Sequence, residues 1–119
     1  MPVSWSETAN EVLAMYALEE KPPRDLEKTA VKESLARLVE LAPGRAVEVR
    51  IPPYAAVQII GGTSHRRGTP PAVVECDSRI WLSLATGVMT WQEALMSGKL
   101  HASGARSDLS AHLPISDAQ

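Results

Sequence analysis

The sequence predicts an α+β domain in which helices pack on one face of a largely antiparallel sheet, preceded by a pair of helices. Three observations indicate this class: helical apolar spacing at the start, strand-like segments in the middle, and short capped helices after them. Strands followed by helices are typical of helices gathered on one side of an antiparallel sheet. We expect one domain over residues 1–119, with the helix pair in 1–42 and the sheet and its covering helices in 46–113.

Two amphipathic helices are expected at the start of the chain. Ser4 and Glu7 form a capping box, and the helix that follows should end near Glu20. Pro22 and Pro23 then separate it from the second helix, whose apolar residues also recur at helical spacing. The apolar positions are Trp5, Ala9, Val12, Leu13 and Tyr16 in the first helix, and Leu26, Ala30, Val31, Leu35, Leu38 and Ala42 in the second.

The pattern changes to strands after the second helix. Residues 46–51 alternate between apolar and charged side chains, which predicts a strand with one wet face. Residues 54–60 are apolar on nearly both faces, with Gln58 as the exception, and this favours a central strand covered by helices on one side. Shorter strands are expected over 73–76 and 100–103.

The loop over residues 61–72 is the best polar candidate site. It is rich in glycine and proline, and it places His65, Arg66 and Arg67 side by side. An arginine guanidinium can hold a carboxylate or phosphate through paired hydrogen bonds, and nearby glycine amides could add donors. The competing interpretation is a solvated hairpin tip without a ligand. We therefore expect either an anionic head-group site or an ordinary turn.

The stretch from Asp77 to Leu113 combines two capped helices with a strand. Asp77 is expected to cap a helix that ends at Gly87. Thr90 and Glu93 form a capping box at the start of the next helix. The two helices are expected over residues 78–86 and 91–97.

This order of features resembles the C-terminal half of the sterol carrier protein family, and in particular its bacterial sterol-carrier-like domains. Members place an acidic residue before a helix, then a glycine, a second helix and a Gly-Lys-Leu strand ending in glycine. The chain departs from the family pattern at Val88, at Ala102 and over 105–110, which is small and polar where the family has an apolar helix. The matching residues are Asp77, Trp81, Leu84, Gly87, Ala94, Gly98, Lys99, Leu100 and Gly104.

The resemblance implies a ligand site between the sheet and the helices that follow it, where the family lines a tunnel for acyl chains or sterols. Each methylene buried there would contribute about 0.8 kcal/mol. Judged by periodicity alone, the same residues are ordinary core. The implied apolar lining consists of Val57 and Ile59 from the sheet and of Trp81, Leu84, Trp91, Leu95 and Leu109 from the elements after it.

The leading functional hypothesis is non-catalytic binding of an apolar small molecule in this cavity: a lipid, a fatty acyl chain or a sterol-like molecule. The alternative is an accessory or protein-interaction module with a closed core and no lipid ligand, because sterol-carrier-like domains also occur fused to enzymes. We expect neither catalysis nor a cofactor, since nothing in the sequence marks a nucleophile elbow or an oxyanion site. The sequence leaves the oligomeric state open.

Composition excludes several other function classes. The twelve basic residues are scattered among fourteen acidic ones, so nucleic acid is not an expected partner. No stretch approaches the roughly 20 apolar residues of a membrane span, and the start of the chain has no signal-peptide pattern, so we expect a cytoplasmic protein. The three histidines and Cys76 lack the close spacing of zinc ligands, and Cys76 is expected to serve packing.

Overall fold

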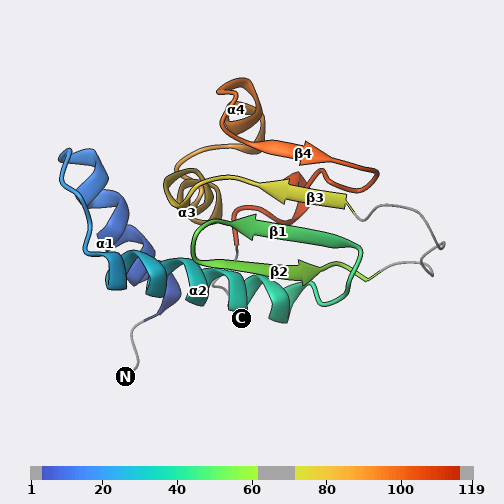
Figure 1. The fold of residues 1–119 in the computed structure, drawn as a ribbon, viewed down its shortest axis with the longest axis horizontal. Helices are drawn as coiled ribbons and strands as arrows, with labels where there is room; N and C mark the ends of the chain where they lie inside the picture. The colour runs from blue at the N-terminus through green and yellow to red at the C-terminus, as the bar shows by residue number, and fades with distance from the viewer. Residues whose placement is uncertain (1–3, 62–71, 116–119) are drawn as a thin grey trace.

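The computed structural model describes residues 4–61 and 72–115. In this part of the chain, four α-helices, a short 3-10 helix and four strands form an α+β domain (Figure 1). The sheet is mixed but mostly antiparallel, and helices pack against it. The predicted fold class is therefore confirmed.

The leading helix pair is α1 (Trp5–Ala17) and α2 (Arg24–Leu41). The Ser4 hydroxyl caps α1 by accepting the backbone N–H of Glu7 at 3.3 Å, as predicted. α1 ends before the expected limit near Glu20, because Glu19 adopts a left-handed φ of 58° that ends the helical path. α2 begins directly after Pro23, whose fixed backbone angle suits a helix start.

The sheet has the strand order β2-β1-β3-β4. β1 runs antiparallel to β2 and parallel to β3, and β3 runs antiparallel to β4. In β1, Val47 and Val49 are fully buried, whereas the intervening Glu48 lies on the opposite face, which confirms the predicted wet face of this strand. The strands are β1 (Val47–Ile51), β2 (Ala55–Ile59), β3 (Ala72–Glu75) and β4 (His101–Ser103).

The prediction of a central strand over residues 54–60 was wrong. β2 lies at the edge of the described strand order, and β1 and β3 occupy its middle. Ala56 and Gln58 are exposed on the outer face, and only Ile59 is fully buried. Alanine is apolar but small, so it tolerates exposure and does not report burial. The same order places β1 between β2 and β3, so the loop over 61–72 does not join a hairpin.

The C-terminal half contains the predicted capped helices α3 (Ser78–Thr86) and α4 (Trp91–Met96). Asp77 accepts the backbone N–H of Ile80 at 2.9 Å, and Gly87 ends α3 with a left-handed φ of 88°. Both hydrogen bonds of the predicted capping box between Thr90 and Glu93 are present. A short 3-10 helix, η1 (Ser110–His112), follows later.

α3 forms the centre of the core. It packs against both α1 and α2, and all but two of its residues are buried. The inner face of the sheet closes the core on the other side, while the outer face carries charged side chains such as Glu48, Arg50 and Glu75. The largest fully buried side chains are Trp81, Leu35, Leu38, Ile51, Ile59, Leu82, Leu84, Leu109, Val12, Val31, Val47 and Val49.

Candidate functional site

The predicted apolar lining is only partly brought together. Ile59, Trp81, Leu84 and Leu109 belong to one core cluster and are at most 1% exposed. Trp91 belongs to the same cluster and is 8% exposed. Val57 is half-buried against the cluster, and Leu95 is 39% exposed and lies outside it.

Trp81 is held by a short chain of buried hydrogen bonds. Its indole Nε1–H donates to Ser34 Oγ at 2.8 Å, and the Ser34 hydroxyl donates to the carbonyl of Val31 at 2.9 Å. Ser34 is fully buried on α2, so this bond joins α3 to α2 inside the core. Sequence reasoning placed Trp81 inside but missed Ser34, because a serine at one position of a helix carries no sign of its distant partner.

A mainly apolar cleft of about 330 Å³ lies beside Trp91. The turn between α3 and α4 forms one wall, and the segment that contains η1 and Pro114 forms the other. Its apolar lining comes from Met89, Trp91, Leu113 and Pro114, and its polar rim from Thr90, Gln92 and Ser110.

Local chemistry explains how both walls of this cleft are held. The backbone N–H of Met89 donates to the Ser83 carbonyl at 3.1 Å, which folds the turn back onto α3. The capping box then starts α4 at Trp91. On the other wall, the backbone N–H of Ile115 donates to the Ala85 carbonyl at 2.9 Å. This bond attaches the C-terminal segment to the end of α3.

His65, Arg66 and Arg67, the predicted head-group site, lie outside the described residues. At the start of their loop, the Arg106 guanidinium donates to the Gly61 carbonyl at 2.9 Å. Arg106 lies in the polar stretch 105–110, and its pairing partner is 45 positions away, so the sequence contained no signal for this contact.

A second cleft, of about 420 Å³, lies at the turn between β1 and β2. Unlike the first, it is lined by several charged residues. Sequence reasoning missed this site because its lining residues come from separate helices, turns and connections that only the tertiary fold brings together. The lining residues are Tyr16, Glu27, Pro52, Pro53, Tyr54, Asp77, Ser78, Arg79 and Lys99.

The two tyrosines of this polar cleft each contact an arginine: Arg79, which lines the cleft, and Arg24, which does not. The Tyr54 hydroxyl donates to Glu27 Oε1 at 2.5 Å, and this bond is the main reason why the pKa of Tyr54 is raised. The Arg24 guanidinium lies 5.6 Å from the centre of the Tyr54 ring. The Arg79 guanidinium lies 5.3 Å from the centre of the Tyr16 ring. Both distances suit a cation–π contact.

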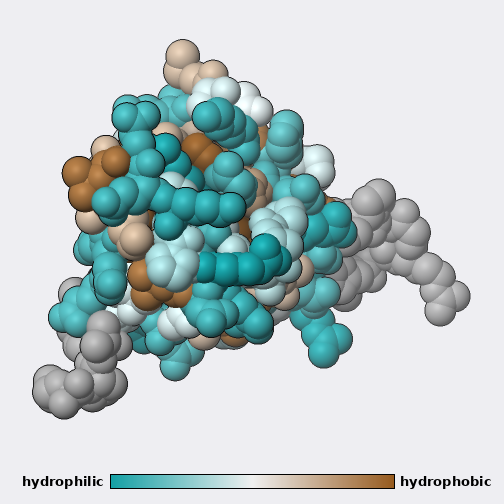
Figure 2. Space-filling view, turned by 60° about the vertical axis from the view of Figure 1, so that its left-hand side comes forward, coloured by the Kyte–Doolittle hydropathy of each residue, from teal (hydrophilic) through white to brown (hydrophobic). Residues whose placement is uncertain are grey.

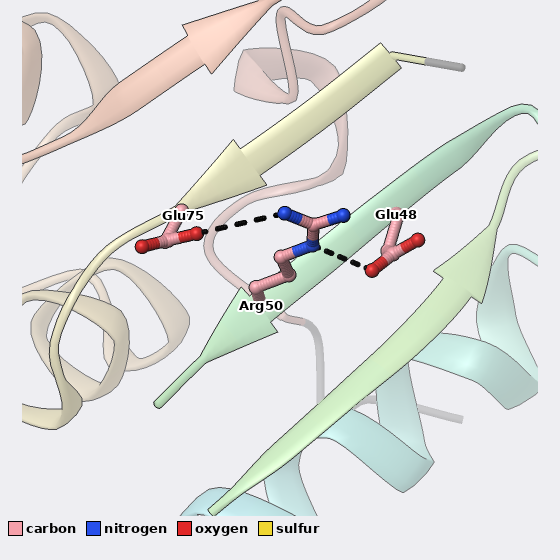
Figure 3. A network of polar contacts seen from close by, with 3 residues as sticks. All are labelled: Glu48, Arg50 and Glu75. Carbon is pink, nitrogen blue, oxygen red and sulfur yellow. Dashed lines mark hydrogen bonds and ion pairs between the residues drawn. The ribbon is translucent and has the colours of Figure 1, made fainter. Parts of the chain in front are cut away.

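The outer face of the sheet carries an exposed ionic ladder (Figure 3). Arg50 Nε lies 2.6 Å from Glu48 Oε2, and its terminal nitrogen lies 3.9 Å from Glu75 Oε1. The hydrogen bond to Glu48 raises the pKa of Arg50 above its ordinary value. Because these charged side chains are solvated, the outer face of the sheet stays in contact with water. Apolar side chains are therefore buried on the inner face.

Cys76 is a buried thiol rather than a reactive group. It is 4% exposed, and burial, with smaller contributions from Asp77 and Glu75, raises its pKa to about 12. Such a thiol stays protonated at neutral pH, which agrees with a packing role. Within residues 4–61 and 72–115, no cluster of three or more His, Cys, Asp or Glu side chains could hold a metal ion.

None of the helices in the described ranges combines the length and apolar character needed to cross a membrane.

Comparison with known proteins identifies a family. Residues 23–115, well over half of the chain, match the model of a protein family described as bacterial SCP ortholog. This match confirms the resemblance to sterol carrier proteins, and it extends from the start of α2 through the sheet to the end of the described segment. No curated protein matches the chain.

Proposed function

We propose that this chain, which belongs to the bacterial SCP ortholog family, binds an apolar small molecule without changing it chemically. The observation that carries this proposal is the cleft beside Trp91, whose lining is mainly apolar. Trp91 also belongs to the core cluster, so the cleft borders the buried residues predicted to line a ligand site. A fatty acyl chain, another lipid or a sterol-like molecule fits this chemistry.

The volume of the cleft limits the size of the ligand that it can hold in this conformation. Its volume of about 330 Å³ is at the lower end of the range of about 300–1,000 Å³ for small-molecule sites. It therefore suits a short acyl chain or one end of a longer ligand. Trp81, Leu84 and Leu109 are at most 1% exposed, so a longer ligand contacts them only after the elements that cover them move apart.

The proposal includes three further contacts. Val57 and Ile59 would form the sheet side of the site, and Leu95 would extend it along α4. An anionic head group would be held by Arg66 or Arg67, with His65 beside them, because guanidinium groups suit carboxylates and phosphates.

A titration with cis-parinaric acid, a fluorescent fatty acid, tests the proposal. Ser110 lies exposed on the rim of the cleft, so Ser110→Phe should fill the space at little cost to folding. Ser103→Phe, on the exposed face of β4, is the matched control. We expect saturable, equimolar binding by the wild type and by Ser103→Phe, and at least about fivefold weaker binding by Ser110→Phe. No saturable binding, or equal binding by both variants, would contradict the proposal.

A protein-interaction module is the second candidate. The observation that favours it is the exposure of large apolar side chains around α4: Val88 is 69% exposed, Leu95 39% and Met96 79%. Exposed apolar groups of this kind can mark contact sites for proteins. This alternative predicts no saturable fatty-acid binding in the titration above, so the same experiment separates the two functions.

A further inference from the structure

We propose that the apolar cleft beside Trp91 selects a ligand whose polar end is uncharged, such as a fatty alcohol or a fatty acyl ester, over the matching carboxylate. This inference rests on the proposed function, because it concerns the same cleft, and it adds the chemical class of the group that lies at the rim. The oxygen atom of a hydroxyl or an ester accepts a hydrogen bond without carrying a charge. Four observations on the cleft favour such a group.

The lining of this cleft contains no charged residue within the described part of the chain. The polar residues on its rim are Thr90, Gln92 and Ser110, and all three are exposed and neutral. On the side of the molecule that Figure 2 shows, the surface is mainly hydrophilic, and apolar residues form separate patches. The lack of charge is therefore a local property of the cleft. A carboxylate placed there would lose water without gaining a cation, which is unfavourable.

Two carboxylates flank the cleft, one on each wall. Glu93 Oε1 accepts the backbone N–H of Thr90 at 2.8 Å, and Asp108 Oδ1 accepts the backbone N–H of Ser110 at 2.9 Å. These hydrogen bonds hold the pKa of each carboxyl group below its ordinary value, so both groups are ionised at neutral pH. Because Thr90 and Ser110 belong to the rim, a bound anion would lie near two negative charges.

The cations that are close in sequence do not balance these two charges at the cleft. Lys99 lines the polar cleft instead, and Arg106 donates to the carbonyl of Gly61. His112 belongs to η1, but it is not among the residues that line the apolar cleft. A negatively charged head group is therefore held outside this cleft, in keeping with the proposed function, which assigns it to arginines of another segment.

The cleft supplies a neutral hydrogen-bond donor in place of a cation. Trp91 lines the cleft and is 8% exposed. Its indole Nε1–H forms no hydrogen bond within the described ranges, whereas that of Trp81 donates to Ser34. Unlike the Nε1–H of Trp5, it is not sealed from solvent. An indole N–H only donates, so a neutral oxygen acceptor satisfies it and leaves no charge uncompensated.

NMR titrations with decanoate, 1-decanol and methyl decanoate test this inference at neutral pH and low ionic strength, where the exposed carboxylates are least screened. The test variant is Glu93→Gln with Asp108→Asn. Each replacement keeps the side-chain oxygen that accepts the backbone N–H, so the charges are lost and the hydrogen bonds remain. The control is Glu11→Gln with Glu33→Gln, two exposed residues outside the cleft, with the same change in net charge.

The alcohol is more apolar than the carboxylate and binds more tightly to any apolar surface, so the comparison between proteins is decisive. We expect decanoate to bind about three- to tenfold more tightly to the test variant than to the wild type. Its affinity for the control variant should equal that for the wild type, and the two neutral ligands should bind all three proteins equally. Both neutral ligands should also shift the indole signal of Trp91, identified by its absence in Trp91→Phe, downfield.

Equal affinity of decanoate for the test and control variants would overturn the selection against charge, and an indole signal of Trp91 that does not respond would overturn the role of this donor. Thermal unfolding shows whether both variants fold as stably as the wild type. If none of the three ligands binds saturably, the proposed function fails as well. Saturable binding of all three ligands without a gain for decanoate in the test variant overturns this inference alone.

Discussion

At the scale of single residues, the hydrogen bond between Trp81 and Ser34 links buried positions on α3 and α2. Trp81 is fully buried, so its indole N–H has no access to water when the serine hydroxyl is removed. We expect Ser34→Ala to lower the free energy of unfolding by about 1–3 kcal/mol, the usual cost of an unsatisfied buried donor. Urea unfolding measures this change.

A double-mutant cycle provides the control. Phenylalanine at position 81 has no N–H, so Ser34→Ala should cost clearly less in a Trp81→Phe background than in the wild type. The same cost in both backgrounds would show that the bond contributes nothing beyond the packing of Ser34.

Cys76 predicts a dependence of stability on alkaline pH. Its pKa of about 12 in the folded protein lies above the value of about 8.5 expected in the unfolded chain. The stability contributed by the neutral thiol is therefore fully present below about pH 8.5 and is lost as the pH rises toward the folded value. We expect the stability of the wild type relative to Cys76→Ala to decrease by about 1–2 kcal/mol between about pH 8 and pH 10.

Urea unfolding of both proteins over this range measures the difference, in which the titration of other groups cancels. A difference that stays constant with pH would contradict the burial of the thiol.

At the scale of elements, the sequence predicted what local chemistry determines. The caps at Asp77 and Thr90 depend on side chains within a few residues of each other, so α3 and α4 were predicted closely. Strand order depends on pairing between distant segments, and local pattern carried no information on it. This is why β2 was assigned to the centre, although it lies at the edge of the described strands. The early end of α1 depends on the left-handed backbone of Glu19, which no residue type there requires.

The capping box at the start of α4 leads to a prediction for this element. Its hydrogen bonds position Trp91 against the core and at the apolar cleft. We expect Thr90→Ala to lower the free energy of unfolding by about 0.5–2 kcal/mol, because the cap of a short helix is lost. Thr29→Ala, at an exposed position inside α2, is the matched control and should be neutral or slightly stabilising. Equal effects of the two substitutions in thermal or urea unfolding would contradict the role of the cap.

At the scale of the whole molecule, the two clefts differ in how far the sequence could predict them. Helical periodicity correctly placed Trp81 and Leu84 in the core, because an inward-facing stripe is a property of one element at a time. Ile59 and Leu109 belong to the same cluster, but they were assigned to the lining through the resemblance to the family. The exposure of Leu95 depends on the distance between α4 and the core. The spacing of apolar residues within α4 contains no information on that distance. The polar cleft combines residues from Tyr16 to Lys99, which only the tertiary fold brings to one place.

Native mass spectrometry during a titration with palmitate tests the central claim most directly, because it reports occupancy and stoichiometry without a spectroscopic label. Binding of an apolar ligand in one cleft predicts a saturable, equimolar complex that disappears under denaturing conditions, and weaker occupancy in Ser110→Phe than in Ser103→Phe. Multiple palmitates that bind without saturation, or no complex at any concentration, would contradict the claim that this chain is a binder of apolar small molecules.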